Sequence, residues 1–298
     1  MLDSAINEQY IMADVIVNGR KFQSVGIRPK GNSSLTQVAN SNSDRYSFRL
    51  QFDEYIKGQT CFGLESFVIN NMLSDNTYMK EYVSYDLMKE IGVDAPSFGF
   101  ADIKVNNENW GLYLAVELYN DSYEERVYND TSGMLYNVKS MDMGGNMGGS
   151  QPRIENNNMP DQMPNFPTTE ERPSSTVDER ELPNIDMEDR MMENRSQGRA
   201  GGMGRSSGRG SLEYIDDNVE SYSSIFTNVV GKGTEEDYQR VIEALKNLSE
   251  GNHLEEYFDV DQILRYLAAH TIVVNLDSYS SSMAQNYYIY ENDGKITI

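Results

Sequence analysis

Cysteine and histidine are almost absent from this sequence. Its 298 residues include one cysteine, Cys61, and two histidines, His253 and His270. A single cysteine excludes an intramolecular disulfide and a cysteine-based zinc site. Two histidines exclude a histidine-rich metal site. No apolar run reaches the roughly 18 residues that a membrane span needs, and the N-terminus lacks the pattern of a signal peptide. The sequence therefore predicts no membrane span.

Positive charge is also scarce. The chain has 25 Lys and Arg against 47 Asp and Glu, which gives a formal net charge of −22. A chain this acidic repels the phosphates of nucleic acids and of anionic membranes, so no nucleic-acid partner is expected. The charge suits a protein that uses a metal ion or binds basic partners.

Three blocks of different composition follow one another. In residues 1–139, alternating apolar residues predict strands at 13–19, 46–52, 66–71, 101–107 and 111–118. One helix is predicted from Asp75 or Asn76 to Ile91, with Gly92 ending it. Residues 140–212 contain one aromatic residue, Phe166, and are rich in Met, Gly, Asn and Ser. Such a segment buries too little apolar area to order itself, so it is predicted to be a disordered insertion.

The third block, residues 213–298, is predicted to be mainly helical. A capping box at Thr234 and Asp237 opens a helix that Gly251 closes. A second helix runs to about Val274, and a polar loop and a strand at 286–292 follow. The chain stops within an apolar alternating run, which indicates a fragment of a longer protein.

The segment "VGIRPKGNSSLTQ" places Arg28 and Lys30 on an extended run before a Gly-Asn-Ser-Ser turn. In one interpretation the turn amides, Ser33, Ser34 and Lys30 bind a phosphate group. In the other, the segment is a strand end with two solvated cations. The residue types alone are consistent with both interpretations of this segment.

The segment "NLDSYSSSMAQNYYIY" is more informative. Asp277 follows an apolar helix, and Asn286 stands at the head of the next strand. An Asp that accepts a hydroxyl proton, followed by an Asn that binds Mg²⁺, is the logic of a kinase catalytic loop, although ordinary kinases have a shorter spacing. The other interpretation makes Asp277 a helix-terminal cap.

Several segments in this order resemble the CotH family of spore-coat kinases. They include "VGIRPKGNSSL", "DRYSFRLQFDEY", "WGLYLAVEL", "GMLYNVK" and "NLDSYSSSMAQNYYIYENDGK", and only residues 140–212 fall outside the resemblance. It implies an α+β, diverged protein-kinase-like fold with two lobes. Residues 1–139 would form an N-terminal lobe with a mixed or antiparallel sheet. Residues 213–298 would begin a mainly helical C-terminal lobe, truncated at its end.

The resemblance also implies an activity and its site residues. The family transfers the γ-phosphoryl group of ATP, with Mg²⁺ or Mn²⁺, to serines of secreted or spore-coat proteins. By matching motifs, Asp277 would be catalytic and Asn286 a metal ligand. Further residues would bind the nucleotide: Arg28, Lys30, Asn32, Ser33, Arg49, Glu81 and Glu117. In this assignment Arg49 pairs with phosphate, Glu81 orients Arg49, and Glu117 meets the adenine.

Two departures from the family pattern accompany these expectations. Gln285 stands where relatives often have His, and the family's next metal-binding Asp falls past Ile298. The chain is therefore expected to transfer phosphate weakly or not at all by itself. The alternatives are a non-catalytic pseudokinase module of a surface assembly and, without any supporting motif, a carbohydrate-active enzyme.

The resemblance further implies a basic, Ser-rich protein substrate and a location in the spore coat or at the cell surface. The insertion ends in "RSQGRAGGMGRSSGRGS", residues 195–211, which combine Arg and Ser without an acidic residue. Two interpretations remain open for it. It is either a solubilising linker or a tethered pseudo-substrate that is phosphorylated at Ser206 or Ser207.

Overall fold

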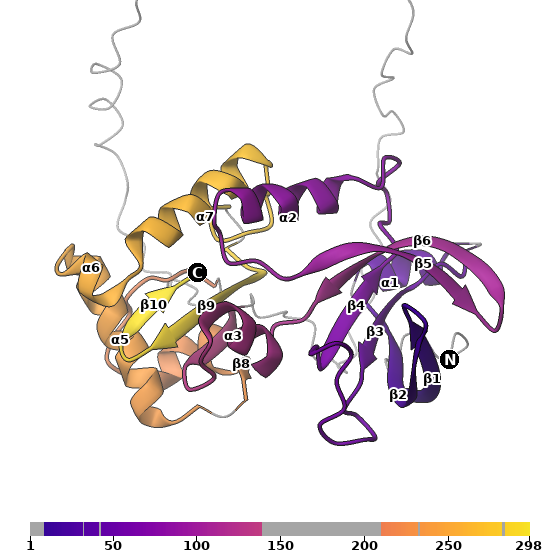
Figure 1. Ribbon diagram of the computed structural model, residues 1–298. Coiled ribbons are helices and arrows are strands. Elements are labelled where there is room, and N and C mark those ends of the chain that lie inside the picture. The colour runs from indigo at the N-terminus through magenta and orange to yellow at the C-terminus, as the bar shows by residue number, and fades with distance from the viewer. Residues whose placement is uncertain (1–8, 32, 42, 139–209, 232, 282–283) are drawn as a thin grey trace, which may run out of the picture. The chain divides into compact units, whose positions relative to one another are not determined.

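A computed structural model describes residues 9–31, 33–41, 43–138, 210–231, 233–281 and 284–298 (Figure 1). The predicted α+β class is confirmed, because this part of the chain folds into two antiparallel sheets and several helices. Nearly all of the predicted insertion, including Ser206 and Ser207, lies outside the described residues. Within them, no helix combines the length and the apolar character needed to cross a bilayer.

The first sheet has six strands in the order β1-β2-β3-β4-β6-β5. Its strands are β1 (Ile11–Val17), β2 (Arg20–Lys30), β3 (Ser47–Gln51), β4 (Ser66–Asn70), β5 (Phe98–Val105) and β6 (Glu108–Glu117). Two hairpins turn at Asn18–Gly19 and Asn106–Asn107, where all four residues have positive φ. Such turns match the twist of paired strands. The sheet is antiparallel throughout, not mixed.

The alternation of side chains gives this sheet two different faces. One face is a hydrophobic core that contains Phe48, Leu50, Phe67 and Ile69. The register sets Arg28 opposite Arg49 and Lys30 opposite Ser47. Because side chains alternate along a strand, these cations point away from that core. The opposite face thus becomes the cationic face of the sheet.

The described part of residues 1–139 contains three helices, where the sequence predicted one: α1 (Ser33–Ala39), α2 (Lys80–Glu90) and α3 (Asp121–Tyr128). The predicted helix α2 begins at Lys80, later than expected. The carboxylate of Asp75 accepts hydrogen bonds from the backbone and hydroxyl of Thr77 and from the backbone N–H of Lys80. Asp75 thus holds a turn before the helix, and the chain becomes helical only after that turn.

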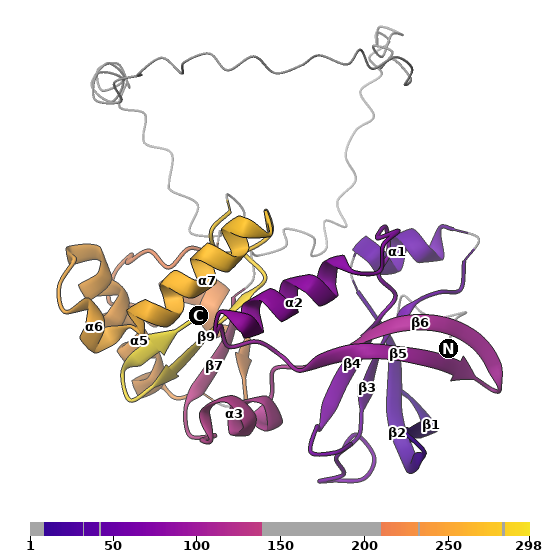
Figure 2. The same ribbon diagram turned by 45° about the horizontal axis from the view of Figure 1, so that its top comes forward.

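Helix α2 connects two apolar clusters. Its Tyr82 and Tyr85 pack against a small cluster with Val68 and Val116 on the cationic face of the sheet. Its Met88 lies in the larger core of the second sheet. Figure 1 and Figure 2 both show α2 beside α7 (Val260–Ile272), and the Arg265 guanidinium on α7 donates to the Ile91 carbonyl at 2.7 Å. This contact joins the C-terminal end of α2 to α7.

The second sheet has four strands in the order β10-β9-β7-β8. They are β7 (Met134–Val138), β8 (Val229–Val230), β9 (Tyr287–Asn292) and β10 (Lys295–Thr297). β7 precedes the predicted insertion in the chain, while its partners β8 and β9 follow it. The third block therefore contributes three strands, where the sequence predicted one.

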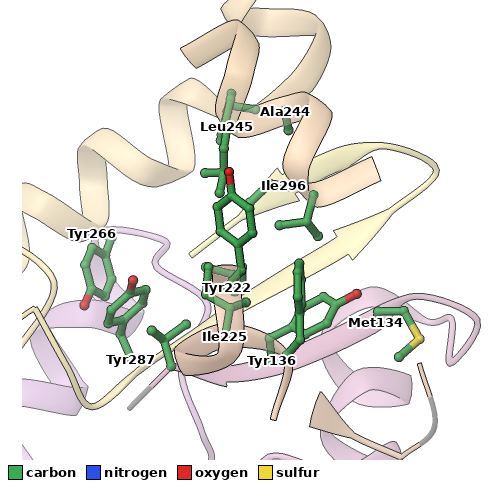
Figure 3. Close-up of a cluster of buried hydrophobic side chains, with 14 of the residues drawn as sticks. Met134, Tyr136, Tyr222, Ile225, Ala244, Leu245, Tyr266, Tyr287 and Ile296 are labelled. Atoms are coloured by element: carbon green, nitrogen blue, oxygen red, sulfur yellow. The ribbon is translucent and has the colours of Figure 1, made fainter. Parts of the chain in front are cut away.

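The helices near this sheet are η2 (Val219–Tyr222), α4 (Ser223–Phe226), α5 (Glu235–Glu250), α6 (Leu254–Tyr257) and α7. The predicted capping box of Thr234 and Asp237 is confirmed, and Gly251 ends α5 in a left-handed conformation. Figure 3 shows the core that these helices share with the strands, with Tyr136, Tyr222, Tyr287 and Ile296 at its centre. This core fixes α7 and β9, and the loop between them carries Asp277.

Glu124 on α3 makes the stability of this fold dependent on pH. It is 4% exposed, and burial, followed by the charges of Asp121 and Asp130, raises its pKa to about 7. The folded protein thus keeps a proton that the unfolded chain releases, and stability falls as the pH rises from about 4.5 to about 7. We expect Glu124→Gln to raise the free energy of unfolding by about 2 kcal/mol at pH 8 and hardly at all at pH 4.

Urea unfolding of both proteins at these two pH values measures this difference. Glu125→Gln, at an exposed position of the same helix, is the matched control and should show no such pH dependence. An equal effect of Glu124→Gln at both pH values would contradict the prediction.

Candidate functional site

Asp277 and Asn286 lie side by side. Asp277 is exposed in the loop between α7 and β9, and Asn286 directly precedes β9 with a φ of 56°. One carboxylate oxygen of Asp277 accepts from Asn286 Nδ2 at 2.7 Å, and the other accepts from Gln285 Nε2 at 2.6 Å. The structure thus brings the two residues of the predicted catalytic loop together.

Asp277 does not cap α7. The C-cap of this helix is Val273, whose backbone N–H donates to the Ala269 carbonyl, and the next N–H, that of Val274, donates to the Thr271 carbonyl. Asp277 lies past this point, and its backbone N–H donates to Asn275 Oδ1 at 3.0 Å. The interpretation of Asp277 as a helix-terminal cap is therefore wrong, and its carboxylate is directed to the amides of the loop.

A second group of site residues lies on the cationic face of the first sheet. Lys30 Nζ donates to Asn70 Oδ1 at 3.1 Å, and Asn70 Nδ2 donates to Glu81 Oε1 at 2.7 Å. Burial lowers the pKa of Lys30 and raises the pKa of Glu81, and the charge of each residue opposes the shift of the other. The hydrogen bonds from Lys30 to Asn70 and from Asn70 to Glu81 thus connect β2 to α2 through β4.

Arg28 and Arg49 face each other across β2 and β3. Burial lowers the pKa of Arg28, and the charge of Arg49 lowers it further. Like charges directly opposite in a sheet are destabilising, and a bound anion relieves this repulsion. In a chain with a net charge of −22, two arginines and a lysine on one face are a local concentration of positive charge.

The expected hydrogen-bond partner of Arg49 was Glu81, but the described partner is Gln51. Arg49 Nε and Nη2 donate to Gln51 Oε1 at 3.2 and 2.8 Å. The described contacts of Glu81 are with Asn70 and, through it, with Lys30. The structure therefore groups Glu81 with Lys30.

Tyr288 lies on β9, the strand that follows the Asp277 loop. It follows Asn286 closely in the chain, and its hydroxyl accepts from Asn137 Nδ2 at 2.9 Å. Burial raises the pKa of Tyr288 to about 12, and the positive charge of Arg49 opposes this rise. Its ring stacks on Tyr119 with the centroids 4.0 Å apart. Burial is thus the main cause of the pKa shift of Tyr288, and the charge of Arg49 is the smaller one.

The predicted phosphate-binding turn is the entry to a short helix. Gly31 has a φ of 120°, which favours glycine, and a Cβ there would overlap the Ser34 hydroxyl. Helix α1 begins at Ser33. Asn32 lies outside the described residues, as does the side chain of Ser33, so their predicted roles stay predictions.

Glu117 serves a different purpose from the one expected of its side chain. It is 2% exposed, and its carboxylate accepts from Arg126 Nη2 at 2.6 Å and from the backbone N–H of Ser97 at 2.8 Å. This ion pair, in which the carboxylate is buried and the guanidinium is partly exposed, joins the end of β6 to α3. The carboxylate is thus engaged within the fold, and the predicted role of Glu117 at the adenine stays a prediction.

No group of three or more His, Cys, Asp or Glu side chains suited to a metal ion occurs among the described residues. Asp277 and Asn286 nevertheless carry a carboxylate and an amide, and the NH₂ group of Asn286 is the part of the amide that faces Asp277. Mg²⁺ prefers oxygen donors and is typically held by one or two protein carboxylates together with substrate phosphates. The donor set therefore fits a metal ion that binds together with a nucleotide.

Sequence reasoning missed three residues of this site: Asn70, Asn275 and Tyr288. Asn275 stands two positions before Asp277, so the triplet "NLD" was a usable signal. Asn70 ends a strand, where a polar residue is common. Tyr288 reads as an ordinary strand residue, and its place near Arg49 depends on the tertiary fold.

The chain matches the family model described as "CotH kinase protein" over residues 27–298. The matched range contains all of the site residues described above. No curated protein matches the chain.

Proposed function

The chain belongs to the CotH kinase family, and from this premise we propose that it transfers the γ-phosphoryl group of ATP to serine or threonine hydroxyls of proteins. The observation that carries the proposal is the pairing of Asp277 with Asn286 in one loop that follows an apolar helix. A kinase of this family uses ATP and a divalent metal ion, and we propose Mg²⁺ or Mn²⁺ here.

We propose further that the fold is a diverged two-lobed kinase fold. In this proposal the six-stranded sheet and α2 form the nucleotide-binding lobe. The second sheet, with α5 and α7, begins the other lobe. Support comes from the hydrogen bonds that link Lys30, Asn70 and Glu81, because they connect a lysine on a strand to a carboxylate on a helix. A Lys–Glu pair of this kind, between a strand and a helix, positions the phosphates in protein kinases.

On the cationic face, the residues of this chain bind and orient the anionic end of the nucleotide. Lys30 and Arg28 lie on one strand and Arg49 on the next. Fixed positive charges in a partly buried site stabilise the charge that develops during phosphoryl transfer. Asn70 and Glu81 hold the Lys30 ammonium in place, so its position is set before the nucleotide binds.

In the loop, Asp277 accepts the proton of the attacking hydroxyl or orients that hydroxyl. Gln285 and Asn286 each donate to one of its oxygens, which fixes the carboxylate plane. When bound, the metal ion neutralises phosphate charge, and the amide oxygen of Asn286 is the group described here that would hold it.

The net charge of −22 supports a basic protein substrate. A long-range attraction to Lys- and Arg-rich segments raises the rate of encounter and falls with salt. We therefore propose a basic, Ser-rich substrate, and a place of action in the spore coat or at the cell surface.

The test is a transfer assay with radiolabelled ATP and Mg²⁺. The acceptors are a basic peptide with one serine, the same peptide with threonine or alanine, and an acidic serine peptide. We expect weak label on the basic serine peptide, less on the acidic one and none on the alanine control. Raising the salt concentration should reduce the difference between the basic and acidic peptides.

A second measurement separates the competing function. Thermal unfolding with and without ATP and Mg²⁺ reports nucleotide binding independently of transfer. Binding without any transfer would identify a pseudokinase module, and neither binding nor transfer would contradict the nucleotide site itself.

A further inference from the structure

The loop that carries Asp277 is attached to α7 through Asn275. Asn275 Oδ1 accepts the backbone N–H of Asp277 at 3.0 Å, and its Nδ2 lies 2.9 Å from His270 Nδ1. Its own backbone N–H donates to the His270 carbonyl at 2.9 Å, and its carbonyl accepts from Ser278 Oγ at 3.1 Å. Every polar group of Asn275 is thus used to hold the start of the loop.

These hydrogen bonds determine the tautomer of His270. Because Asn275 Oδ1 takes the Asp277 amide, the group that faces His270 is the NH₂, which only donates. His270 Nδ1 must then be an unprotonated acceptor, and the ring proton lies on Nε2. His270 is 8% exposed and its ring centroid lies 4.2 Å from that of Tyr266, so packing also fixes the plane of the ring.

We propose that His270 and Asn275 are positioning residues for Asp277, with the neutral imidazole holding Asn275 and Asn275 holding the Asp277 backbone. This inference rests on the proposed kinase function. The other described contacts of the Asp277 side chain are with Gln285 and Asn286, which lie in the same loop. Among these described contacts, one link connects Asp277 to a buried side chain on a helix. It runs from the Asp277 backbone through Asn275 to His270.

The positioning role follows from what the loop lacks. Residues 275–281 contain no helix or strand, and Val274 has a φ of 53°, where a β-branched residue is strained. A loop of this kind keeps one geometry only if side chains fix it. A displacement of a catalytic carboxylate by about 1 Å can reduce the rate roughly 100-fold. Removal of the His270 acceptor should therefore reduce catalysis more than nucleotide binding.

The first experiment compares two substitutions of His270 in the full chain. His270→Phe keeps a ring against Tyr266 but has no acceptor, and we expect kcat for phosphoryl transfer to fall roughly 10- to 100-fold with KM for ATP unchanged. His270→Asn places an amide oxygen near the position of Nδ1 and should recover most of this loss. Asn275→Ala should lower kcat as His270→Phe does, and the double variant should lose little more.

His253→Asn is the matched control, because His253 is exposed and joins none of these contacts. A loss in His270→Asn equal to that in His270→Phe, or equal effects on kcat and KM, would overturn the positioning role. Thermal unfolding of each variant shows whether it is folded.

The second experiment needs neither catalysis nor a variant. Long-range ¹H–¹⁵N correlation NMR of the imidazoles distinguishes the two neutral tautomers, and the chain has only two histidines to assign. We expect His270 to carry its proton on Nε2 at neutral pH. A proton on Nδ1 would overturn the inference. If the tautomer is as expected but the wild-type protein transfers no phosphate, the kinase proposal fails while the anchoring of the loop by His270 stands.

Discussion

Asp277→Asn should reduce phosphoryl transfer by about 10²- to 10⁴-fold and leave the fold intact. The range is the usual contribution of general acid–base catalysis. Asn keeps the size of the side chain and one acceptor oxygen, but it cannot take a proton. Asp277 is exposed and its carboxylate bonds only to loop amides in the described contacts, so the stability of the core is not expected to change.

The measurement is single-turnover transfer from ATP, with ATP affinity determined separately. Asp261→Asn is a matched control, since Asp261 is an exposed acid on α7 that pairs with Arg265 at 2.7 Å. This control should retain full transfer. Transfer by Asp277→Asn at a rate near that of the wild type would exclude Asp277 as the catalytic base.

The strands were predictable because their patterns are local. Alternating apolar residues, together with the turn residues between them, predicted six strands close to their observed bounds. These strands are β1, β3, β4, β5, β6 and β9. The capping box of Thr234 and Asp237 likewise acts within a single helical turn. Such signals depend on neighbouring residues alone, so the sequence carries them in full.

Short helices and long-range pairing were not predictable in the same way. Helix α1 has seven residues, with no acidic residue in its first turn and no basic residue in its last. β7 pairs with β9 across the whole predicted insertion, and only tertiary packing brings them together. Helix α2 begins late because Asp75 bonds to its own following turn before the helix starts.

The site shows the same division. Asp277 and Asn286 belong to one loop, and a motif found them both. The partner of Glu81 depends on which side chains meet across three elements, and sequence matching assigned it to Arg49. The structure groups Glu81 with Lys30 through Asn70, since a polar strand end of β4 lies between them.

This difference leads to a prediction about which cation acts in phosphate transfer. Lys30→Met removes the ammonium while keeping an apolar chain of similar length, and we expect kcat/KM for ATP to fall about 10²- to 10³-fold, as for loss of one preorganised donor. Arg49→Met should have a smaller effect, because the described side-chain hydrogen bonds of Arg49 are to Gln51.

Double variants with Glu81→Gln decide whether Lys30 and Glu81 act as one unit. In the double variant with Lys30→Met, the added loss from Glu81→Gln should be small, because the carboxylate then has no ammonium to hold. In the double variant with Arg49→Met, the two losses should multiply, since Arg49 and Glu81 share no described hydrogen bond. Steady-state kinetics over a range of ATP concentrations gives the four values of each cycle. Coupling of Glu81 to Arg49, with independence from Lys30, would restore the assignment made from the sequence and contradict the one drawn from the structure.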